Sequence, residues 1–226
     1  MELPVSLPSR VPIDRDGLPY VAGGFAVAGA GLLLGGRLGS RLALLGSLAG
    51  AGTAFFFRDP EREVLPVEKG ILSPADGRVI DVREVAATEF LDVPSWKISI
   101  FLNLHDCHIV RIPVNGKIAY KGESMGGYAP AYDPAAESNR RLSVGIRGMA
   151  GSPDCLLRLV AGLVARQIVC RKEIGDGVEQ GERLGLIKFG SRVDLFFPRT
   201  LELTVAPGER TTGGITMIAR PLRERE

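Results

Sequence analysis

The sequence is short of several residue types that define whole classes of protein. It has only two histidines, His105 and His108, so any chemistry that needs an imidazole has to use that one place. Its three cysteines, Cys107, Cys155 and Cys170, are widely spaced and odd in number, which argues against a disulfide framework and suits a reducing compartment. The net charge of +2 comes without a dense run of Lys or Arg, and this predicts no nucleic-acid partner.

Charge is also absent from two stretches near the N-terminus. Residues 1–17 are polar and contain several prolines, and we expect no regular structure there. Residues 18–36 and 42–57 then hold no charged side chain, and Arg37 and Arg41 interrupt them at the expected turn. A membrane-spanning helix needs about 20 apolar residues, so the first stretch is just long enough and the second is marginal. Small residues throughout both stretches would let two helices pack closely in lipid.

These stretches predict a membrane-associated helical hairpin over residues 18–57. Whether the hairpin spans the bilayer, re-enters it or lies at its surface stays open, because positive charge is found on both sides of it. The competing interpretation is a buried, Gly- and Ala-rich hairpin of a protein without membrane contact. Residues 55–62, three phenylalanines followed by charged residues and a proline, are typical of a membrane–water boundary.

The remainder of the chain, residues 58–226, has the pattern of a β-rich domain. Short runs of alternating apolar and polar residues are separated by turn sequences rich in Gly, Pro, Asn and Asp. The expected strands are Arg78–Glu84, Lys97–Leu102, Lys117–Ser124, Arg141–Arg147, Leu156–Val164, Gln167–Lys172 and the long run Leu184–Phe197. Ala129–Ser138 is expected to be a loop with one helical turn. We predict a mostly β (α+β) fold, a β-rich barrel or sandwich preceded by an apolar helical hairpin.

Two strand-like runs meet at Gly190-Ser191. Glycine inside a strand pattern marks a bulge, a bend or a close approach of backbone, and the ordinary interpretation is a glycine bulge in a β-hairpin. A serine directly after glycine also has its hydroxyl next to a backbone carbonyl with no Cβ in the way. That arrangement would suit attack by Ser191 on its own preceding peptide bond. Spacing alone leaves both interpretations open.

Three motifs carry a resemblance to a known family. Residues 181–194, Gly-Glu-Arg-Leu-Gly-Leu-Ile-Lys-Phe-Gly-Ser-Arg-Val-Asp, resemble the processing site of the phosphatidylserine decarboxylase proenzymes in their short form. Residues 73–79 resemble the Pro-Ala-Asp-Gly motif of that family, whose aspartate, here Asp76, assists self-cleavage. Residues 101–116 resemble its His-x-x-Arg/His-x-Pro signature, with His108 as the first histidine. Three motifs in the right order are more specific than any one of them.

Each of these residues also has an ordinary interpretation. Asp76 stands in an Asp-Gly turn and can be purely structural, and His108 can be a core histidine. A metal site of His105, Cys107 and His108 is disfavoured, because residues i and i+3 of a strand point to opposite faces and no second histidine pair exists. Some family members have a second histidine where this chain has Arg111, which leaves open whether His105 shares the chemistry.

The resemblance implies that the chain cuts itself between Gly190 and Ser191. The products would be a β chain, residues 1–190, and an α chain, residues 191–226, that stay paired. Ser191 would become a pyruvoyl group, so that neither pyridoxal phosphate nor a metal is needed. This group would act as the electron sink while phosphatidylserine loses CO2 and becomes phosphatidylethanolamine.

The resemblance also suggests roles for other residues and a location. His108, oriented by Asp76, would accept the serine proton, and Asn139 lies in a run similar to one near the family's active site. Arg111, together with the arginine pair at positions 140–141, is a candidate for holding the substrate phosphate. The hairpin would keep the site at the lipid headgroups, which predicts a cell-membrane location with the β-rich domain on the cytoplasmic side. Assembly beyond the paired chains stays open.

Three other functions stay as alternatives. A membrane-tethered domain that binds a lipid or partner without cleaving itself would be expected to lack one of Asp76, His108, Gly190 or Ser191, and all four are present. A pyruvoyl-dependent decarboxylase of a soluble amino acid would leave the hairpin without a purpose. A serine hydrolase that uses the uncut serine would need a Gly-x-Ser-x-Gly elbow, which does not surround Ser191.

Overall fold

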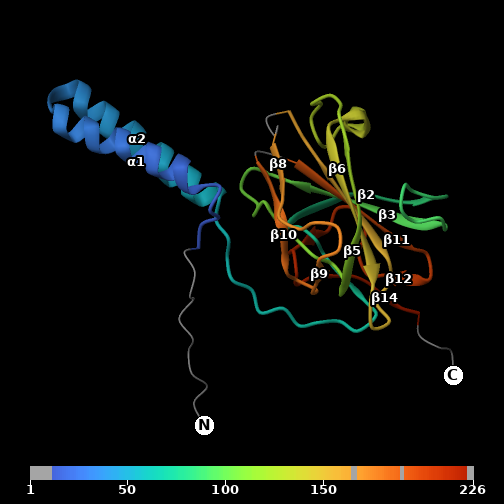
Figure 1. The fold of residues 1–226 in the computed structure, drawn as a ribbon. Coiled ribbons are helices and arrows are strands. Elements are labelled where there is room, and N and C mark those ends of the chain that lie inside the picture. The colour runs from blue at the N-terminus through green and yellow to red at the C-terminus, as the bar shows by residue number, and fades with distance from the viewer. Residues whose placement is uncertain (1–11, 164–166, 189–190, 223–226) are drawn as a thin grey trace, which may run out of the picture. The chain divides into compact units, whose positions relative to one another are not determined.

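The computed structural model describes residues 12–163, 167–188 and 191–222 (Figure 1). The chain divides into two compact units, Met1–Glu61 and Arg62–Glu226. The first unit contains two helices, and the second is built from β-strands. The prediction of a mostly β fold with an N-terminal helical hairpin is therefore confirmed.

The hairpin consists of α1 (Leu18–Leu34) and α2 (Gly36–Phe56), which run antiparallel (Figure 1). Gly35 joins them with a φ of 67°, a left-handed conformation that glycine adopts without the penalty of a Cβ. The helices contact each other through small residues, and a Cβ added to Gly46 would lie 2.4 Å from the backbone nitrogen of Ala28. The expected close packing through glycine and alanine is confirmed, because no larger side chain fits at such a contact.

The outer surface of the hairpin is apolar, and Leu33 on it is 92% exposed. Arg37 and Arg41 lie in the first turns of α2 instead of in the connecting turn where we expected them, because Gly35 alone makes the connection. Neither of the described helices combines the length and the hydropathy that crossing a membrane requires.

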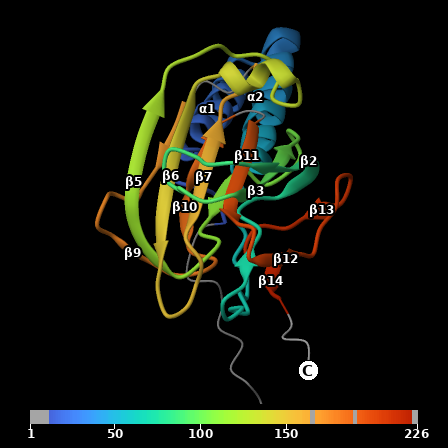
Figure 2. The same ribbon diagram turned by 90° about the vertical axis from the view of Figure 1, so that its right-hand side faces the viewer.

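The second unit is built around an eight-stranded antiparallel sheet that curls over its core (Figure 2). Its strands in spatial order are β13 (Arg210–Thr211), β2 (Gly77–Val85), β3 (Ser95–Leu102), β11 (Ser191–Pro198), β7 (Cys155–Val160), β6 (Arg141–Gly148), β5 (Gly116–Ser124) and β9 (Gly177–Val178). Two three-stranded sheets complete the unit, one of β1 (Ile71–Leu72), β14 (Met217–Pro221) and β12 (Leu201–Leu203), the other of β4 (Ile109–Arg111), β10 (Arg183–Lys188) and β8 (Gln167–Cys170). A 3-10 helix, η1 (Pro134–Ser138), supplies the expected helical turn.

The hydrophobic core contains residues from all three sheets. Alternation along β11 shows the principle: Val193, Leu195 and Phe197 belong to this core, whereas Phe196 packs in a separate small cluster. Successive side chains of a strand point to opposite faces, so odd-numbered residues of β11 face the core and even-numbered ones face outward. Ser191 therefore begins the strand on its core side.

The glycine bulge in a β-hairpin is wrong as an interpretation of the Gly190-Ser191 stretch. β10 pairs with β4 and β8, whereas β11 pairs with β3 and β7 in the other sheet. The two runs are consecutive in the chain but are not each other's partners. Alternation within a strand predicts the strand but carries no information on its partner.

Candidate active site

The chain passes between the large sheet and a small sheet at two places. Residues 103–108 lead from β3 in the eight-stranded sheet to β4 in a three-stranded sheet. Residues 189–190, which lie outside the described residues and include the predicted cleavage residue Gly190, lead from β10 back to β11. β10 pairs with β4 on one side, and Ser191 pairs with Leu102 on the other. The strands that flank residues 103–108, β3 and β4, are thus paired with β11 and β10, the strands on either side of residues 189–190.

Ser191 is fully buried, with 0% of its surface exposed. It lies on the face of β11 that also carries the core residue Val193. Within the described part of the chain its Oγ has no hydrogen-bond partner. A buried hydroxyl without a partner costs about 1–3 kcal/mol, and native proteins rarely keep one unless it has a reactive role or another specific reason.

His108 ends the 103–108 segment and is 1% exposed. The backbone N–H of Ile187 in β10 donates to the carbonyl oxygen of His108 at 3.3 Å, so the histidine lies against the residues that lead into the step before Ser191. Its ring Nδ1 lies 3.0 Å from the backbone oxygen of Asp106. A carbonyl only accepts, so this contact places the proton of a neutral ring on Nδ1 and makes Nε2 the basic nitrogen.

Asp106, which the sequence patterns did not single out, fixes the shape of this segment. Its Oδ2 accepts from the backbone N–H of Asn103 at 2.8 Å, and its Oδ1 pairs with the Arg210 guanidinium of β13. An aspartate that bonds its own turn in this way holds the turn rigid, and here it also fixes the carbonyl that orients His108. The sequence did offer one indication of this role: Asp106 follows Asn103 by three residues, a spacing at which a side chain can bond the backbone of its own turn. His105 lies at the surface of the same turn, with 67% of its side chain exposed.

Asp76 lies in the turn before β2, and its carboxylate is fully engaged. Both of its oxygens accept from the Arg62 guanidinium, at 2.7 and 2.8 Å, and Oδ1 also accepts from the backbone N–H of Gly213 at 2.8 Å. The Asp106 carbonyl lies against the His108 ring, and a role of Asp76 in orienting His108 stays a prediction. The sequence did not show the Arg62 contact because Arg62 stands 14 residues earlier and folds back.

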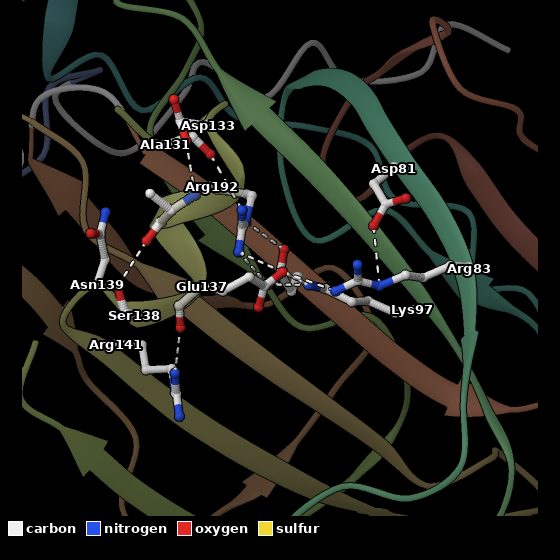
Figure 3. Close-up of polar contacts among 12 residues, drawn as sticks. Asp81, Arg83, Lys97, Ala131, Asp133, Glu137, Ser138, Asn139, Arg141 and Arg192 are labelled. Carbon is white, nitrogen blue, oxygen red and sulfur yellow. Dashed lines mark hydrogen bonds and ion pairs between the residues drawn. The ribbon is translucent and has the colours of Figure 1, made fainter. Parts of the chain in front are cut away.

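A group of charges, which we term the outer ion cluster, lies against the outward face of β11: Lys97, Arg192 and Asp194 are buried, and the Glu137 side chain is 45% exposed. Figure 3 labels Lys97, Glu137 and Arg192 of this cluster. Arg192 lies 2.8 Å from Asp194 and 3.4 Å from Glu137, and Lys97 lies 3.3 Å from Asp194 and also contacts Glu137. Burial acts to raise the pKa of Glu137, but the hydrogen bond from Lys97 and the surrounding cationic charges outweigh it and hold that pKa below its usual value. The cluster joins η1 to the residue next to Ser191.

Known proteins resemble this chain over most of its length. A family model described as "Phosphatidylserine decarboxylase" matches residues 50–219. The chain belongs to the phosphatidylserine decarboxylase family. A phosphatidylserine decarboxylase proenzyme of Carboxydothermus hydrogenoformans is 40% identical over 210 residues, which cover 91% of this chain and 95% of the relative. Proenzymes of the same name from Symbiobacterium thermophilum and Desulfotalea psychrophila are 40% and 36% identical and cover 95% and 99% of their own lengths, or 92% and 95% of this chain.

Membership of the phosphatidylserine decarboxylase family confirms the resemblance that the three motifs indicated. The relatives are named as proenzymes, precursors that become active only after processing. Of the residues in those motifs, Ser191 begins β11 and pairs with Leu102, and His108 ends the segment that leads from β3 to β4. The third, Asp76, lies in the turn whose Ala75 oxygen accepts from the Thr211 hydroxyl at 3.0 Å.

Two further candidates of this decarboxylase-family chain are held by internal bonds. The Asn139 side chain accepts from the backbone N–H of Ala129 and donates to the carbonyls of Ala129 and Ala161, each at 2.8 Å. Arg111 is 3% exposed and donates to the Gly181 carbonyl at 2.9 Å. Both contacts are structural, and a part in the reaction stays a prediction for either residue. Among the described residues, no group of three or more His, Cys, Asp or Glu side chains is arranged to hold a metal ion.

Proposed function

We propose that this chain is a self-processing, pyruvoyl-dependent phosphatidylserine decarboxylase. The observation that carries the proposal is the buried Ser191 hydroxyl, which has no partner within the described residues and stands at the step where the family's proenzymes are expected to cut. A non-cleaving binding module would have no use for such a hydroxyl, because a hydrogen-bonded serine or an alanine would be more stable there.

Self-cleavage uses groups of this chain alone. Ser191 Oγ attacks the carbonyl carbon of residue 190 while Nε2 of His108 takes the hydroxyl proton, and the peptide nitrogen leaves to give an ester. Loss of the Cα proton of residue 191 then breaks the bond between Cβ and the ester oxygen, which frees the carboxyl end of the β chain and leaves a dehydroalanine. Addition of water to that group releases ammonia and leaves a pyruvoyl group at the start of the α chain.

The position of Ser191 fits such a group. β11 is paired on both sides, with β3 and β7, so the new chain end stays in place after the cut. The surrounding face is apolar, which excludes water from a reactive carbonyl. When present, the pyruvoyl carbonyl supplies the electron sink that decarboxylation of an amino-acid headgroup needs. His108, which is buried and whose carbonyl accepts from the Ile187 N–H, is the proton carrier we assign to return a proton to the carbon that has lost CO2.

The apolar hairpin would attach this enzyme to a membrane. Its exposed leucines and phenylalanines favour insertion at a membrane, where a diacyl substrate stays. We place the enzyme at the cell membrane with its catalytic unit on the cytoplasmic side, because three cysteines that form no disulfide within the described residues suit a reducing compartment. The paired β and α chains are its minimal assembly.

The test is intact mass and N-terminal sequencing of the purified full chain beside Ser191→Ala. We expect wild type to give two chains, the smaller one starting at residue 191 and blocked at its N-terminus, and Ser191→Ala to stay uncut. The processed protein should release CO2 from phosphatidylserine and form phosphatidylethanolamine. Ser124→Ala, a partly exposed serine at the end of β5, is the matched control and should process normally. An uncut wild type in detergent and in lipid would make the chain a binding module and end the proposal.

A further inference from the structure

One end of the eight-stranded sheet carries Ser191 and also presents large apolar side chains to solvent. We term these residues the apolar rim: Leu104, Met125, Tyr132 and Leu163, which are 60%, 77%, 64% and 63% exposed. They lie where β3, β5 and β7 end and where β6 and β11 begin, the upper end of the sheet in Figure 2. Single exposed apolar residues are ordinary on protein surfaces, but a group of them around a reactive residue indicates a docking surface.

The register of the sheet places two rim residues on either side of Ser191. The serine pairs with Leu102 of β3, and Leu104 follows two residues later in the turn beyond that strand. The next residue, Arg192, pairs with Val160 of β7, and Leu163 follows that strand in the same way. Neighbouring strands of a sheet lie about 4.8 Å apart, so both loops stand next to the start of β11.

The other two rim residues sit on the segment 125–138, which is fastened to the same place. The Tyr132 ring meets the Phe101 ring of β3 edge to face, with 5.6 Å between the ring centres. Asn139 bonds the backbone of Ala129 in this segment and the carbonyl of Ala161 just before Leu163. These contacts join the loops that carry the rim residues, so the positions of the loops relative to one another are fixed.

A cationic side chain, Arg78, lies at the same end of the sheet as the apolar rim. Arg78 of β2 is exposed, pairs in register with Phe101, and its Nε donates to the Gly208 carbonyl at 2.9 Å. No carboxylate partner is found for it within the described residues. An exposed guanidinium beside an apolar surface suits the phosphate of a lipid headgroup whose acyl chains meet the apolar part.

We propose that the apolar rim enters the surface of an anionic phospholipid bilayer, so that the catalytic unit docks on the membrane through its own loops and not only through the hairpin. This rests on the proposed function, since a lipid substrate whose acyl chains remain in the bilayer has to reach a residue that is buried at this end of the sheet. Leu104 and Leu163, which follow the two strands paired with β11, would keep water from Ser191 when the rim meets the bilayer. The rim then selects serine headgroups that are presented by a bilayer over serine compounds in solution.

The direct test reports contact with acyl chains. A tryptophan is placed in the full chain with the only native one removed by Trp96→Phe and with Ser191→Ala to keep every variant uncut. Leu163→Trp probes the rim, and Ile174→Trp, at a position 62% exposed at the opposite end of the sheet, is the matched control. Phosphatidylserine vesicles with brominated acyl chains should quench the rim tryptophan several-fold more than the control. Equal quenching at the two ends, or none at Leu163→Trp and at a second variant, Leu104→Trp, would overturn the proposal.

The second readout uses the processed enzyme. Met125→Ser with Leu163→Ser should lower the ratio of turnover on vesicle phosphatidylserine to turnover on a dissolved short-chain phosphatidylserine by about tenfold, because two apolar contacts with lipid are lost. Met149→Ser with Ile174→Ser, at the opposite end, should leave this ratio within about twofold. A ratio that falls equally in both double variants contradicts the rim.

The quenching test and the turnover ratio distinguish a failure of the proposed function from a failure of the apolar rim as a membrane-docking surface. If wild type decarboxylates neither substrate, the proposed function fails, while the quenching of uncut chains still decides the rim. If light scattering shows that the rim substitutions turn an oligomer into a monomer and the quenching pattern is absent, the rim is an interface between copies of this chain and the membrane proposal is wrong.

Discussion

Ser191 and Arg192 are consecutive residues of one strand, yet they stand in opposite chemical surroundings. On the core side, the Ser191 hydroxyl is buried among apolar side chains and has no hydrogen-bond partner within the described residues. On the outward side, Arg192 is almost as buried but lies within 3.4 Å of the carboxylates of Asp194 and Glu137. The outward face holds its buried charges in ion pairs, whereas the Ser191 hydroxyl on the core face has neither an ion pair nor a hydrogen bond within the described residues.

The difference shows how the chain keeps a reactive group in place. A buried group without a partner lowers stability, so its position has to be secured by other contacts. Here the contacts are the pairing of β11 with two neighbours and the outer ion cluster that begins at the very next residue. In the proposed cleavage residue 191 would become a chain end, and these same contacts would keep it from fraying.

The largest effect is expected from removing the unsatisfied hydroxyl. Ser191→Ala should abolish self-cleavage and decarboxylation, yet it should raise the free energy of unfolding by about 1–3 kcal/mol, because the buried hydroxyl no longer has to be desolvated without a bond. The measurement compares urea unfolding of His108→Gln, expected to be uncut with its serine intact, with that of the double variant His108→Gln, Ser191→Ala. A double variant that is less stable than the single one would mean that the hydroxyl is bonded after all.

The alternation of side chains made much of this fold predictable. The strands observed as β2, β3, β5 and β6 agree with the predicted runs to within two residues, and a helical turn is found at Pro134–Ser138 inside the loop expected to contain one. Local period and turn chemistry decide these elements, and both are written in the sequence. Two-residue strands such as Ile71–Leu72 and Arg210–Thr211 were missed because they have no period to read, and the five-residue strand Met217–Pro221 was missed as well.

The site was predictable in its motifs but not in its contacts. Ser191 and His108 could be identified from motifs, and the structure brings the segments that carry them together through pairing in two sheets. The partner of Asp76 could not be identified, because the bond to Arg62 depends on how the chain before β1 folds back. The outer ion cluster was also missed. Lys97 is 1% exposed, and nothing in an alternating Lys-Ile-Ser-Ile run tells which lysine is covered by a distant loop.

A smaller but still large effect is expected on the outward face. Lys97→Met should lower the free energy of unfolding by about 3 kcal/mol or more, because Asp194, which is 1% exposed, loses one of its two cations in a region that water does not reach. Lys117→Met, an exposed lysine of β5, is the matched control and should change stability by less than about 0.5 kcal/mol. Both are measured by urea unfolding in the Ser191→Ala chain, which keeps every sample uncut.

Comparing Lys97→Met with Lys117→Met also tests whether the outer ion cluster on the outward face of β11 keeps Ser191 in place on the core face. If the cluster secures the start of β11, Lys97→Met in the otherwise native chain should slow self-cleavage as well, while Lys117→Met should not. Adding Asp194→Asn should recover part of the lost stability, since the charge left without its partner is then removed. Equal unfolding curves for the two lysine variants would show that the outer ion cluster does not hold the strand.

The smallest effect concerns pH. Burial acts to raise the pKa of Glu89, but hydrogen bonds from Arg158 and from Ser143, at 2.6 Å, outweigh it and lower the pKa from 4.5 to about 2. A lowered folded-state pKa contributes stability that is complete above the unfolded value of 4.5 and is lost as pH falls toward 2. Glu89→Gln should therefore flatten the acid limb of the stability profile between these values, whereas Glu123→Gln, at a side chain that is 62% exposed, should leave it as in wild type. Urea midpoints taken from pH 6 downward decide this, and parallel profiles for wild type and Glu89→Gln would show that the Arg158 pair on the outward face is too solvated to matter.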